Sequence, residues 1–321
     1  MSSISLIDEN KIREIIGDDC LFVKECVLEA LRLHYDKQVC QPPKQYLRPS
    51  PNEHQLNRII SMPVYITGSN PAAGLKWIGS HPENFKRGME RANAIIVLND
   101  TQTNAPIAVL NGSLISSMRT LATSLISIDS FRAQPRTVAC IGMGKLGRLH
   151  ARLLPGLYPS IERILGYSKT ANFDDLLALP YFEKCSSYVD AIEEADVVIA
   201  TTAATSPYII PSDISGDKLM INLSLMDFEP AVYVEADAVV VDDWLQCTKA
   251  EKVFKYCVDQ GLIDRSSVWE LSEVVYGSQR SNIFPGKVIV NLIGMAVEDI
   301  VVARAIYDRV RGARDGGGCL S

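Results

Sequence analysis

The stretch TVACIGMGKLGRLHARLL, residues 137–154, combines a short apolar run with three glycines, Gly142, Gly144 and Gly147. The run predicts a buried strand, and the residues after the second glycine have the spacing of a helix. A Gly-x-Gly-x-x-Gly turn in this context is typical of a dinucleotide-binding fold. Its glycines permit the tight turn, the approach of the backbone to the pyrophosphate, and close packing of helix on strand. The residues that we expect to line the phosphates are Gly142, Met143, Gly144, Lys145, Leu146 and Gly147.

The next predicted strand ends in GYSKT, residues 166–170, where folds that bind NAD carry an acid for the ribose hydroxyls. This chain has Ser168 and Lys169 at that point, and no carboxylate before Asp174. A carboxylate would repel the 2′-phosphate of NADP, whereas a hydroxyl and an ammonium group can accept it. The tip therefore favours NADP or the use of both cofactors, with a merely solvated loop lysine as the alternative.

Strands and helices alternate over residues 116–289, and each strand is a nearly continuous apolar run. This pattern predicts an α/β fold with a parallel sheet buried on both faces. Residues 58–112 contain consecutive short strands joined by turns, which favours an antiparallel or mixed sheet. Residues 288–312 have the pattern of one long helix that packs back onto this first part. We predict a Rossmann domain over 116–289, and an α/β sheet domain for substrate binding and dimerisation over 1–115 and 290–321.

Composition excludes several classes of function. The 321 residues are 47% hydrophobic and 22% charged, which is typical of a soluble globular protein, and the net charge of −6 argues against binding of nucleic acid. No apolar run reaches the roughly 18–20 residues that cross a bilayer, and the N-terminus lacks the layout of a signal peptide. We therefore expect a cytoplasmic protein with no membrane partner.

The eight cysteines and four histidines show no metal-binding spacing, so we expect no metal site.

Four charged residues outside the turn are candidates for handling a small acidic substrate. Lys76 lies mid-strand between Leu and Trp, and is either an edge residue or an inward cation that awaits an anion. Arg119 lies on the helix before the dinucleotide domain, where a guanidinium can clamp a carboxylate. Arg48 is a further candidate cation, although exposed arginines are common. Asp227 directly follows a buried strand, at the end where such folds place catalytic groups, and can act as a general base.

Six stretches resemble the ornithine cyclodeaminase/μ-crystallin family: GLKWIGS, SLISSMRTLATS, IGMGKLG, ADVVIATTAATSPYI, INLSLMD and NLIGMAVEDI. They occur in the order of the family between about residue 40 and residue 310. The resemblance implies that Lys76 and Arg119 bind a substrate carboxylate, that Arg48 is a further anion contact, and that Asp227 and Lys76 act in catalysis. It also implies a homodimer joined through the N-terminal sheets. The positions that it places along the nicotinamide half of the cofactor are Met62, Thr201, Thr202, Asn222, Ser224, Gly294 and Met295.

Within the family, QPPKQYLRP and LSLMDFEP resemble the branch that forms 2,3-diaminopropionate. Ornithine cyclodeaminases carry a Gly-Gly-Asp-Cys-Pro-Gly-Lys-like run where this chain has SLMDFEP, and only Asp227 is shared. The branch implies NAD(P)-dependent oxidative hydrolysis of N-(2-amino-2-carboxyethyl)-L-glutamate to L-2,3-diaminopropionate and 2-oxoglutarate, for siderophore or antibiotic precursors.

Two other functions stay open. One is an NAD(P)H-dependent imine (ketimine) reductase or an amino-acid cyclodeaminase of the same family, and the other is a non-catalytic nucleotide-binding protein. The branch usually has aspartate at position 168, so Ser168 leaves the choice between NAD and NADP open.

Overall fold

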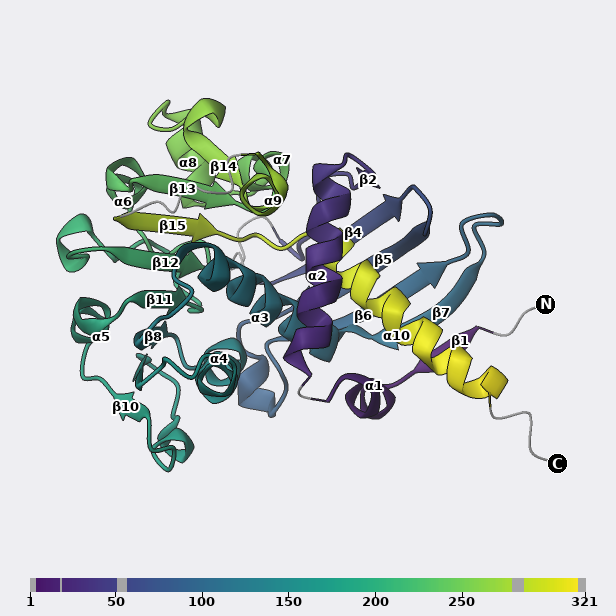
Figure 1. Cartoon of the computed structure of the whole chain (residues 1–321), viewed down its shortest axis with the longest axis horizontal. Helices are drawn as coiled ribbons and strands as arrows, with labels where there is room; N and C mark the ends of the chain where they lie inside the picture. Colours follow the sequence, from purple (N-terminus) through teal and green to yellow (C-terminus); the bar gives the residue numbers. More distant parts are fainter. Residues whose placement is uncertain (1–3, 18, 51–56, 279–285, 317–321) are drawn as a thin grey trace. The chain divides into compact units, whose positions relative to one another are not determined.

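The computed structural model of the chain describes residues 4–17, 19–50, 57–278 and 286–316 (Figure 1). Among these residues, no helix combines the length and the apolar character needed to cross a membrane. The same residues contain no group of His, Cys, Asp and Glu side chains arranged to hold a metal ion, and their cysteines are free thiols.

The chain divides into two compact units, which we describe separately. Unit 1 comprises residues 1–123 and 294–321, and unit 2 comprises residues 124–293. Both divisions fall a few residues after the boundaries expected from the sequence. The first division falls inside helix α3, Gly112–Phe131, as does the expected boundary, and the second falls two residues after strand β15, Lys287–Asn291.

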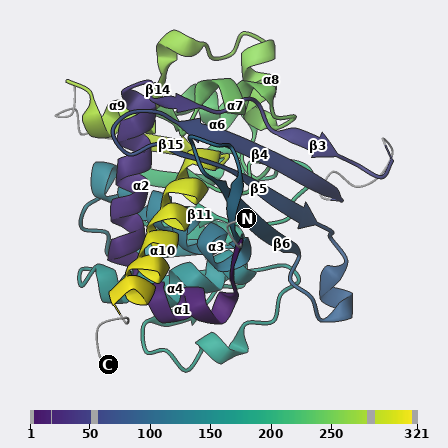
Figure 2. The same cartoon turned by 90° about the vertical axis from the view of Figure 1, so that its right-hand side faces the viewer.

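Unit 1 contains a mixed sheet in the order β1-β7-β6-β5-β4-β2, and β3 also pairs with β4. The four strands from β4 to β7 are antiparallel, as their alternation with turns predicts, whereas β1 runs parallel to β7. Helix α10 packs on β4, β5 and β6 and also on α2 (Figure 2). The strands are β1 Ser5–Ile7, β2 Val39–Cys40, β3 Gln45–Leu47, β4 Arg58–Ile66, β5 Ala72–Ser80, β6 Ala92–Asn99 and β7 Pro106–Asn111. The helices are α1 Glu9–Ile16, α2 Cys20–Tyr35, η1 Asn84–Arg87, the first part of α3, and α10 Ala296–Gly316.

The two faces of this sheet differ because side chains alternate along each strand. The inner face packs on α10, so close at Gly74 that an added Cβ atom would lie 2.7 Å from the Cδ1 atom of Ile300. Lys76 lies on this inner face, since its register partners Met62 and Ile96 are both buried. The outer face carries exposed apolar side chains, among them Leu47, Ile59, Trp77 and Ile95.

Unit 2 is a sheet of eight parallel strands in the order β10-β9-β8-β11-β12-β15-β13-β14, so the predicted parallel sheet is confirmed. Its central strands are buried on both faces, as continuous Val/Ile runs predict. The strands are β8 Thr137–Ile141, β9 Arg163–Tyr167, β10 Phe182–Lys184, β11 Val197–Ala200, β12 Lys218–Asn222, β13 Ala238–Val241, β14 Val268–Glu270 and β15 Lys287–Asn291. The helices are α4 Lys145–Leu157, η2 Asp174–Leu176, α5 Tyr188–Glu194, η3 Pro211–Asp213, α6 Pro230–Glu235, α7 Trp244–Lys249, α8 Val253–Asp259, η4 Arg265–Ser267 and α9 Leu271–Tyr276, besides the second part of α3.

The structure corrects one expectation about the C-terminal part of the chain. The sequence predicts a single helix over residues 288–312, but the first residues of that stretch belong to β15, and the helix α10 begins only at Ala296. The run Val288–Val290 is β-branched and pairs on one side with β12 and on the other with β13. Gly294, with a φ of +79°, then turns the chain before the helix.

Candidate functional site

The glycine turn of unit 2 is held against the end of β11. Gly142 has a φ of +96°, and a Cβ atom there would lie 2.8 Å from the carbonyl carbon of Thr201. A Cβ atom on Gly147 would lie 2.1 Å from the carbonyl oxygen of Gly142. The Thr201 hydroxyl donates a hydrogen bond of 2.6 Å to that same oxygen. Glycine is therefore required at both positions by the close approach of β8, α4 and β11.

The start of α4 is open, in contrast to the glycines on either side. Gly144 is the N-cap residue of α4, which has no side-chain cap. Its chain neighbours aside, the described residues place no heavy atom within 4 Å of where its Cβ atom would be. Gly144 and Lys145 are exposed, whereas Met143 is buried. The strand order reverses next to β8, and this is where open α/β sheets bind dinucleotides. These residues therefore fit the pyrophosphate of a dinucleotide.

The tip of β9 carries no carboxylate, as its sequence indicates. The Ser168 hydroxyl accepts a hydrogen bond of 3.2 Å from the backbone N–H of Ala171, and Lys169 is exposed and forms no ion pair with the described residues. The nearest acids in the sequence are already paired with cations. Asp175 binds Arg148 at 2.6 Å and also Arg152, and Asp174 binds Lys184 at 2.8 Å. An anion at the tip would therefore meet a hydroxyl and a cation.

Asp227 is fully buried and accepts hydrogen bonds from three hydroxyl groups of unit 2. Thr202 and Tyr208 donate to its Oδ1 atom, the latter at 3.0 Å, and Ser224 donates to Oδ2. Burial and the charge of Asp227 raise the pKa of the Tyr208 hydroxyl far above its ordinary value, so Tyr208 keeps its proton and acts as a donor. Among the residues that the structure describes, Ser224 is the one that donates to Oδ2, so this atom has capacity to accept a further proton or donor.

Asn222 supports the turn that carries Asp227. Its Nδ2 atom donates to the hydroxyl of Tyr233 at 2.9 Å and to the Oδ1 atom of Asn291 at 3.1 Å, and its own Oδ1 atom accepts from the backbone N–H of Leu225. Leu225 has a φ of +70°, an uncommon conformation for a side chain of this kind. The Asn222 side chain, which the family resemblance places along the cofactor, thus orders the buried end of β12.

Unit 1 contains four buried charged side chains and one half-buried hydroxyl that we call the Lys76 cluster: Lys76, Arg119, Glu298, Asp299 and Ser116. The Nζ atom of Lys76 donates to both carboxylate oxygens of Asp299 and to the hydroxyl of Ser116, each at 2.9 Å. Arg119 binds Glu298 at 2.8 Å and Asp299 at 3.3 Å. Burial lowers the pKa of Lys76 to about 8, although the charge of Asp299 opposes this shift. The two predicted cations are therefore brought together, and both have carboxylate partners.

The chain around Gly294 is fitted to the Lys76 cluster. A Cβ atom on Gly294 would lie 2.5 Å from the Nη1 atom of Arg119, so a side chain there would displace the guanidinium. The backbone N–H of Met295 donates to Glu298 at 3.3 Å, and the Met295 side chain is buried. Among the residues expected along the nicotinamide, Gly294, Met295 and Met62 belong to unit 1, and the others belong to unit 2.

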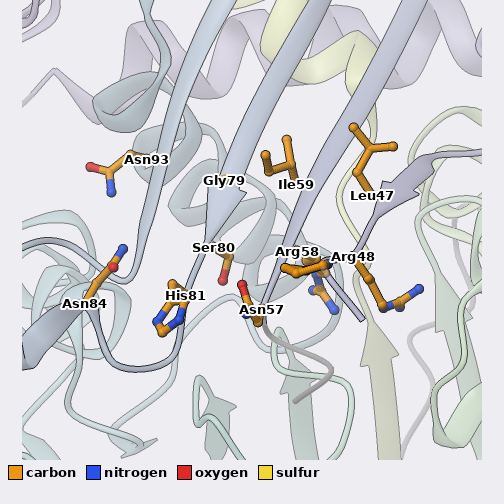
Figure 3. A pocket seen from close by; sticks show the side chains of 11 residues that line it. Leu47, Arg48, Asn57, Arg58, Ile59, Gly79, Ser80, His81, Asn84 and Asn93 are labelled. Carbon is orange, nitrogen blue, oxygen red and sulfur yellow. The ribbon is translucent and has the colours of Figure 1, made fainter. Parts of the chain in front are cut away.

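Arg48 lies outside the Lys76 cluster, directly after β3. It is exposed, and its Cζ atom lies 5.1 Å from the centre of the Tyr46 ring. It lines a cavity of about 490 Å³ at the end of strands β3 to β6 (Figure 3). Arg58 and His81 line the same cavity, and neither stands out in the sequence.

Comparison with known proteins agrees with this geometry. The model of the ornithine cyclodeaminase/mu-crystallin family matches residues 19–314. The chain belongs to this family. One curated relative, the N-((2S)-2-amino-2-carboxyethyl)-L-glutamate dehydrogenase of Staphylococcus aureus, is 33% identical over 95% of each chain. The Delta(1)-pyrroline-2-carboxylate reductase of Bacillus cereus is 28% identical over 81% of this chain and 83% of its own.

Solved structures with the same fold are known. The Thermococcus litoralis Delta(1)-pyrroline-2-carboxylate reductase, solved in complex with NADH and L-proline, superposes with a TM-score of 0.86 over 97% of this chain and 98% of its own, at 22% identity. The expected family and fold class are therefore confirmed. The relatives also confirm the predicted enzyme class, an oxidoreductase that acts on CH–NH groups with NAD or NADP.

Sequence reasoning missed several residues of this family member. Glu298 and Asp299 are neighbouring acids in an otherwise apolar helical stretch. Two acids in such a stretch indicate buried carboxylates, and this pattern could have identified them. Tyr208 and Ser116 lie within stretches that resemble the family, but their roles become visible only from the hydrogen bonds that they donate or accept.

Proposed function

We propose that this chain catalyses the NAD(P)-dependent oxidative hydrolysis of N-(2-amino-2-carboxyethyl)-L-glutamate to L-2,3-diaminopropionate and 2-oxoglutarate. The observation that carries the proposal is the 33% identity to the Staphylococcus aureus dehydrogenase over 95% of both chains. The chemistry of the residues supports it. The substrate is a secondary amine with three carboxylates, and the chain offers cations for carboxylates, a buried acid and a dinucleotide turn.

In this proposal the β8–α4 turn holds the pyrophosphate of NAD or NADP, and Ser168 and Lys169 contact the adenosine ribose. When bound, the nicotinamide supplies a hydride acceptor, which allows the secondary amine to be oxidised to an imine at the Cα atom of the glutamate half. The residues that we propose along the nicotinamide are Met62, Thr201, Thr202, Asn222, Ser224, Gly294 and Met295.

Asp227 activates the water that hydrolyses the imine. Its Oδ2 atom takes a proton from water while the oxygen bonds to the imine carbon, and Tyr208 and Thr202 hold the carboxylate in place through Oδ1. The nitrogen takes this proton to give a carbinolamine, and Asp227 then takes the proton of the new hydroxyl group and passes it to the nitrogen as the carbon–nitrogen bond breaks. The new oxygen stays on 2-oxoglutarate, and the nitrogen leaves as the amine of 2,3-diaminopropionate.

Lys76 and Arg119 bind the carboxylate next to the reacting carbon. Because Lys76 directs its N–H groups at Asp299 and Ser116, a bound carboxylate replaces one of these contacts. Burial also lowers the pKa of Lys76, and we propose that this residue takes part in catalysis as well. Arg48 provides a further contact for a carboxylate.

The second candidate is an imine reductase or a cyclodeaminase of the same family. The 28% identity to the Bacillus cereus Delta(1)-pyrroline-2-carboxylate reductase favours the reductase, and the β9 tip without a carboxylate suits NADPH. In that reaction the same residues bind a carboxylate next to an imine that is reduced.

We further propose a cytoplasmic homodimer that supplies 2,3-diaminopropionate for siderophores or antibiotics. The exposed apolar side chains on the outer face of the unit 1 sheet, such as Trp77 at 36%, Ile95 at 45% and Leu47 at 54%, support a second copy as the partner. Sedimentation velocity tests the dimer, and Ile95→Lys should shift it to monomer.

One assay separates the two enzymatic candidates. The protein is incubated with the N-linked glutamate conjugate and either NAD or NADP, and the products are quantified by mass spectrometry. The proposed reaction gives equal amounts of reduced cofactor, 2-oxoglutarate and 2,3-diaminopropionate. Turnover of Δ1-pyrroline-2-carboxylate with NADPH, together with no reaction of the conjugate, supports the reductase instead.

A further inference from the structure

Three buried polar side chains, Asn222, Tyr233 and Asn291, meet behind the turn that carries Asp227, and we call them the Asn222 group. Asn222 and Asn291 are register partners at the ends of the parallel strands β12 and β15, which lie side by side (Figure 1). Tyr233, on helix α6, places its hydroxyl 2.9 Å from Nδ2 of Asn222 and 2.8 Å from Oδ1 of Asn291. Tyr233 and Asn291 are 1% and 2% exposed, so small molecules do not reach them.

The directions of these hydrogen bonds follow from one another. A backbone N–H can only donate, so the N–H of Leu225, at 2.9 Å, fixes which side of the Asn222 amide carries Oδ1. The Nδ2 atom then faces Tyr233 and Asn291 and donates to both. Burial raises the pKa of Tyr233 far above its ordinary value, so its hydroxyl keeps its proton and donates it to Asn291. Each of the three side chains therefore has a single orientation, and the other two hold it there.

Asn222 in turn holds the backbone of Leu225 in an uncommon conformation. The φ of +70° lies in the left-handed region, which costs free energy for a residue with a side chain, and the bond to Asn222 offsets part of this cost. Leu225 lies between Ser224 and Asp227 in the chain. Ser224 accepts a hydrogen bond of 3.1 Å from the N–H of Thr202 and donates to Oδ2 of Asp227. The conformation at Leu225 therefore decides how Ser224 and Asp227 meet.

The chain on the other side of Asp227 is fixed by separate contacts. The carbonyl oxygen of Asp227 accepts hydrogen bonds from the backbone N–H groups of Tyr208 and Ile209, each at 2.9 Å. Phe228 also pairs with Ile209 as a β-bridge. These contacts do not involve the Asn222 group. The Asn222 group thus acts on the side of the turn that carries Ser224, which is the partner of Oδ2.

We propose that Tyr233 and Asn291 are positioning residues for the reaction. Through Asn222 they hold the turn of residues 222–227, so that Ser224 meets Oδ2 of Asp227 and the carboxylate keeps the orientation in which it activates water. The effect on turnover rests on the proposed function, whereas the hold on the turn does not. Because both residues are buried away from substrate and cofactor, their removal should slow the chemical step and leave the affinity for the substrate intact.

The first test compares two tyrosines of unit 2 that each lose a buried hydroxyl. Tyr233→Phe should lower kcat for the glutamate conjugate at least about tenfold and leave KM within about twofold, because a misplaced acid weakens stabilisation of the transition state alone. Tyr158→Phe is the matched control, since this hydroxyl donates to the Leu125 carbonyl at 3.1 Å and to Asp129 at 2.7 Å. It should leave kcat and KM within about twofold of the wild type.

Asn291→Ala reaches the same turn from a different strand, and it serves also if Tyr233→Phe folds poorly. It removes the oxygen that accepts from both Asn222 and Tyr233, so kcat should again fall at least about tenfold. Since both changes act through Asn222, the double variant should be about as slow as the slower single variant. Losses that multiply in the double variant would overturn the proposed action through Asn222.

Amide hydrogen exchange measures the hold on the turn without turnover. Mass spectrometry with fragmentation to single residues follows the N–H of Leu225. It should exchange at least about tenfold faster in Tyr233→Phe and Asn291→Ala, and at the wild-type rate in Tyr158→Phe.

The two measurements separate this proposal from the proposed function. If the wild type does not turn over the conjugate but the exchange at Leu225 responds as expected, the proposed function fails and the hold on the turn stands. If Leu225 exchanges at the wild-type rate in both variants, or if kcat stays at the wild-type value while exchange rises, the proposal is wrong. It is equally wrong if Tyr158→Phe lowers kcat as much as Tyr233→Phe does.

Discussion

The Nζ atom of Lys76 lies 2.9 Å from each carboxylate oxygen of Asp299, although the two residues are 223 positions apart in the chain. Their side chains are 2% and 0% exposed. Burying a charged side chain costs free energy of folding. For Lys76 and Asp299 this cost is offset by their mutual attraction, so both must be present. Because Asp299 also accepts a hydrogen bond from Arg119, its carboxylate supports both cations that we propose for substrate binding.

Asp299→Asn should destabilise unit 1 strongly. The change leaves Lys76 and Arg119 buried with one carboxylate fewer, so we expect a loss of about 3–5 kcal/mol in the free energy of unfolding, measured with urea and circular dichroism. The control is Asp308→Asn, which breaks the exposed Arg304–Asp308 pair and should cost less than about 1 kcal/mol. Equal losses in the two variants would contradict the role of the cluster.

Asp227→Asn should separate catalysis from cofactor binding. The amide keeps the shape of the carboxylate but cannot take a proton from water, so kcat should fall by about 10²–10⁴ while the dissociation constant of NADH stays the same. Fluorescence titration of NADH and turnover of the conjugate measure the two quantities. Asp217→Asn, at an exposed position of the same unit, is the control. Near-normal turnover in Asp227→Asn would show that another group activates the water.

Gly147→Ala and Gly156→Ala form a matched pair on helix α4. A methyl group at position 147 would lie 2.1 Å from the Gly142 carbonyl oxygen, whereas position 156 has open space within 4 Å. Gly147→Ala should therefore distort the dinucleotide turn and raise the dissociation constant of NADH by at least about tenfold. Gly156→Ala should bind NADH as the wild type does, with stability unchanged or raised by up to about 1 kcal/mol. Equal binding by both variants would argue against the turn as the pyrophosphate site.

Ser168→Asp should move the cofactor preference toward NAD. A carboxylate at the β9 tip repels the 2′-phosphate of NADP and accepts hydrogen bonds from ribose hydroxyls. We expect the dissociation constant of NADP to rise at least about tenfold while that of NAD stays equal or falls, both measured by calorimetry. Ser168→Asn adds an amide of similar size without the charge. If it shifts the preference as much as Ser168→Asp does, size and not charge is responsible.

The buried His150 should make unit 2 sensitive to acid. Burial lowers its pKa from 6.5 to about 4, and its ring nitrogens contact the Leu146 carbonyl at 2.8 Å and the Ser124 hydroxyl at 3.0 Å. Between these pH values the unfolded chain binds a proton that the folded chain does not. The stabilisation is therefore complete above pH 6.5, and it is lost as the pH falls toward 4. The thermal midpoint should drop between pH 7 and pH 5 by more in the wild type than in His150→Gln. Equal drops would mean that other groups cause the acid sensitivity.

Local patterns were sufficient to predict much of the fold. The turn at Gly142–Gly147 follows from glycine spacing between a strand and a helix, and the parallel sheet follows from repeated Val/Ile runs. Residues 288–291 show the limit of this reasoning. An apolar run next to a helical pattern is predicted to be part of the same helix, although here it forms strand β15. Pairing with β12 and β13 decides the conformation there, and both partners are remote in the sequence.

The amino-acid sequence by itself determined that a dinucleotide turn exists, that its ribose tip has no carboxylate, and that Lys76, Arg119 and Asp227 are the charged residues to consider. Each of these depends on neighbours within a few positions. Only the tertiary structure decided what surrounds those charges: Asp299 beside Lys76, three hydroxyls on Asp227, and Arg58 stacked with Arg48 on Tyr46. The physical reason is that the state of a buried charge depends on the groups within a few ångströms of it, and folding brings those groups from distant parts of the chain.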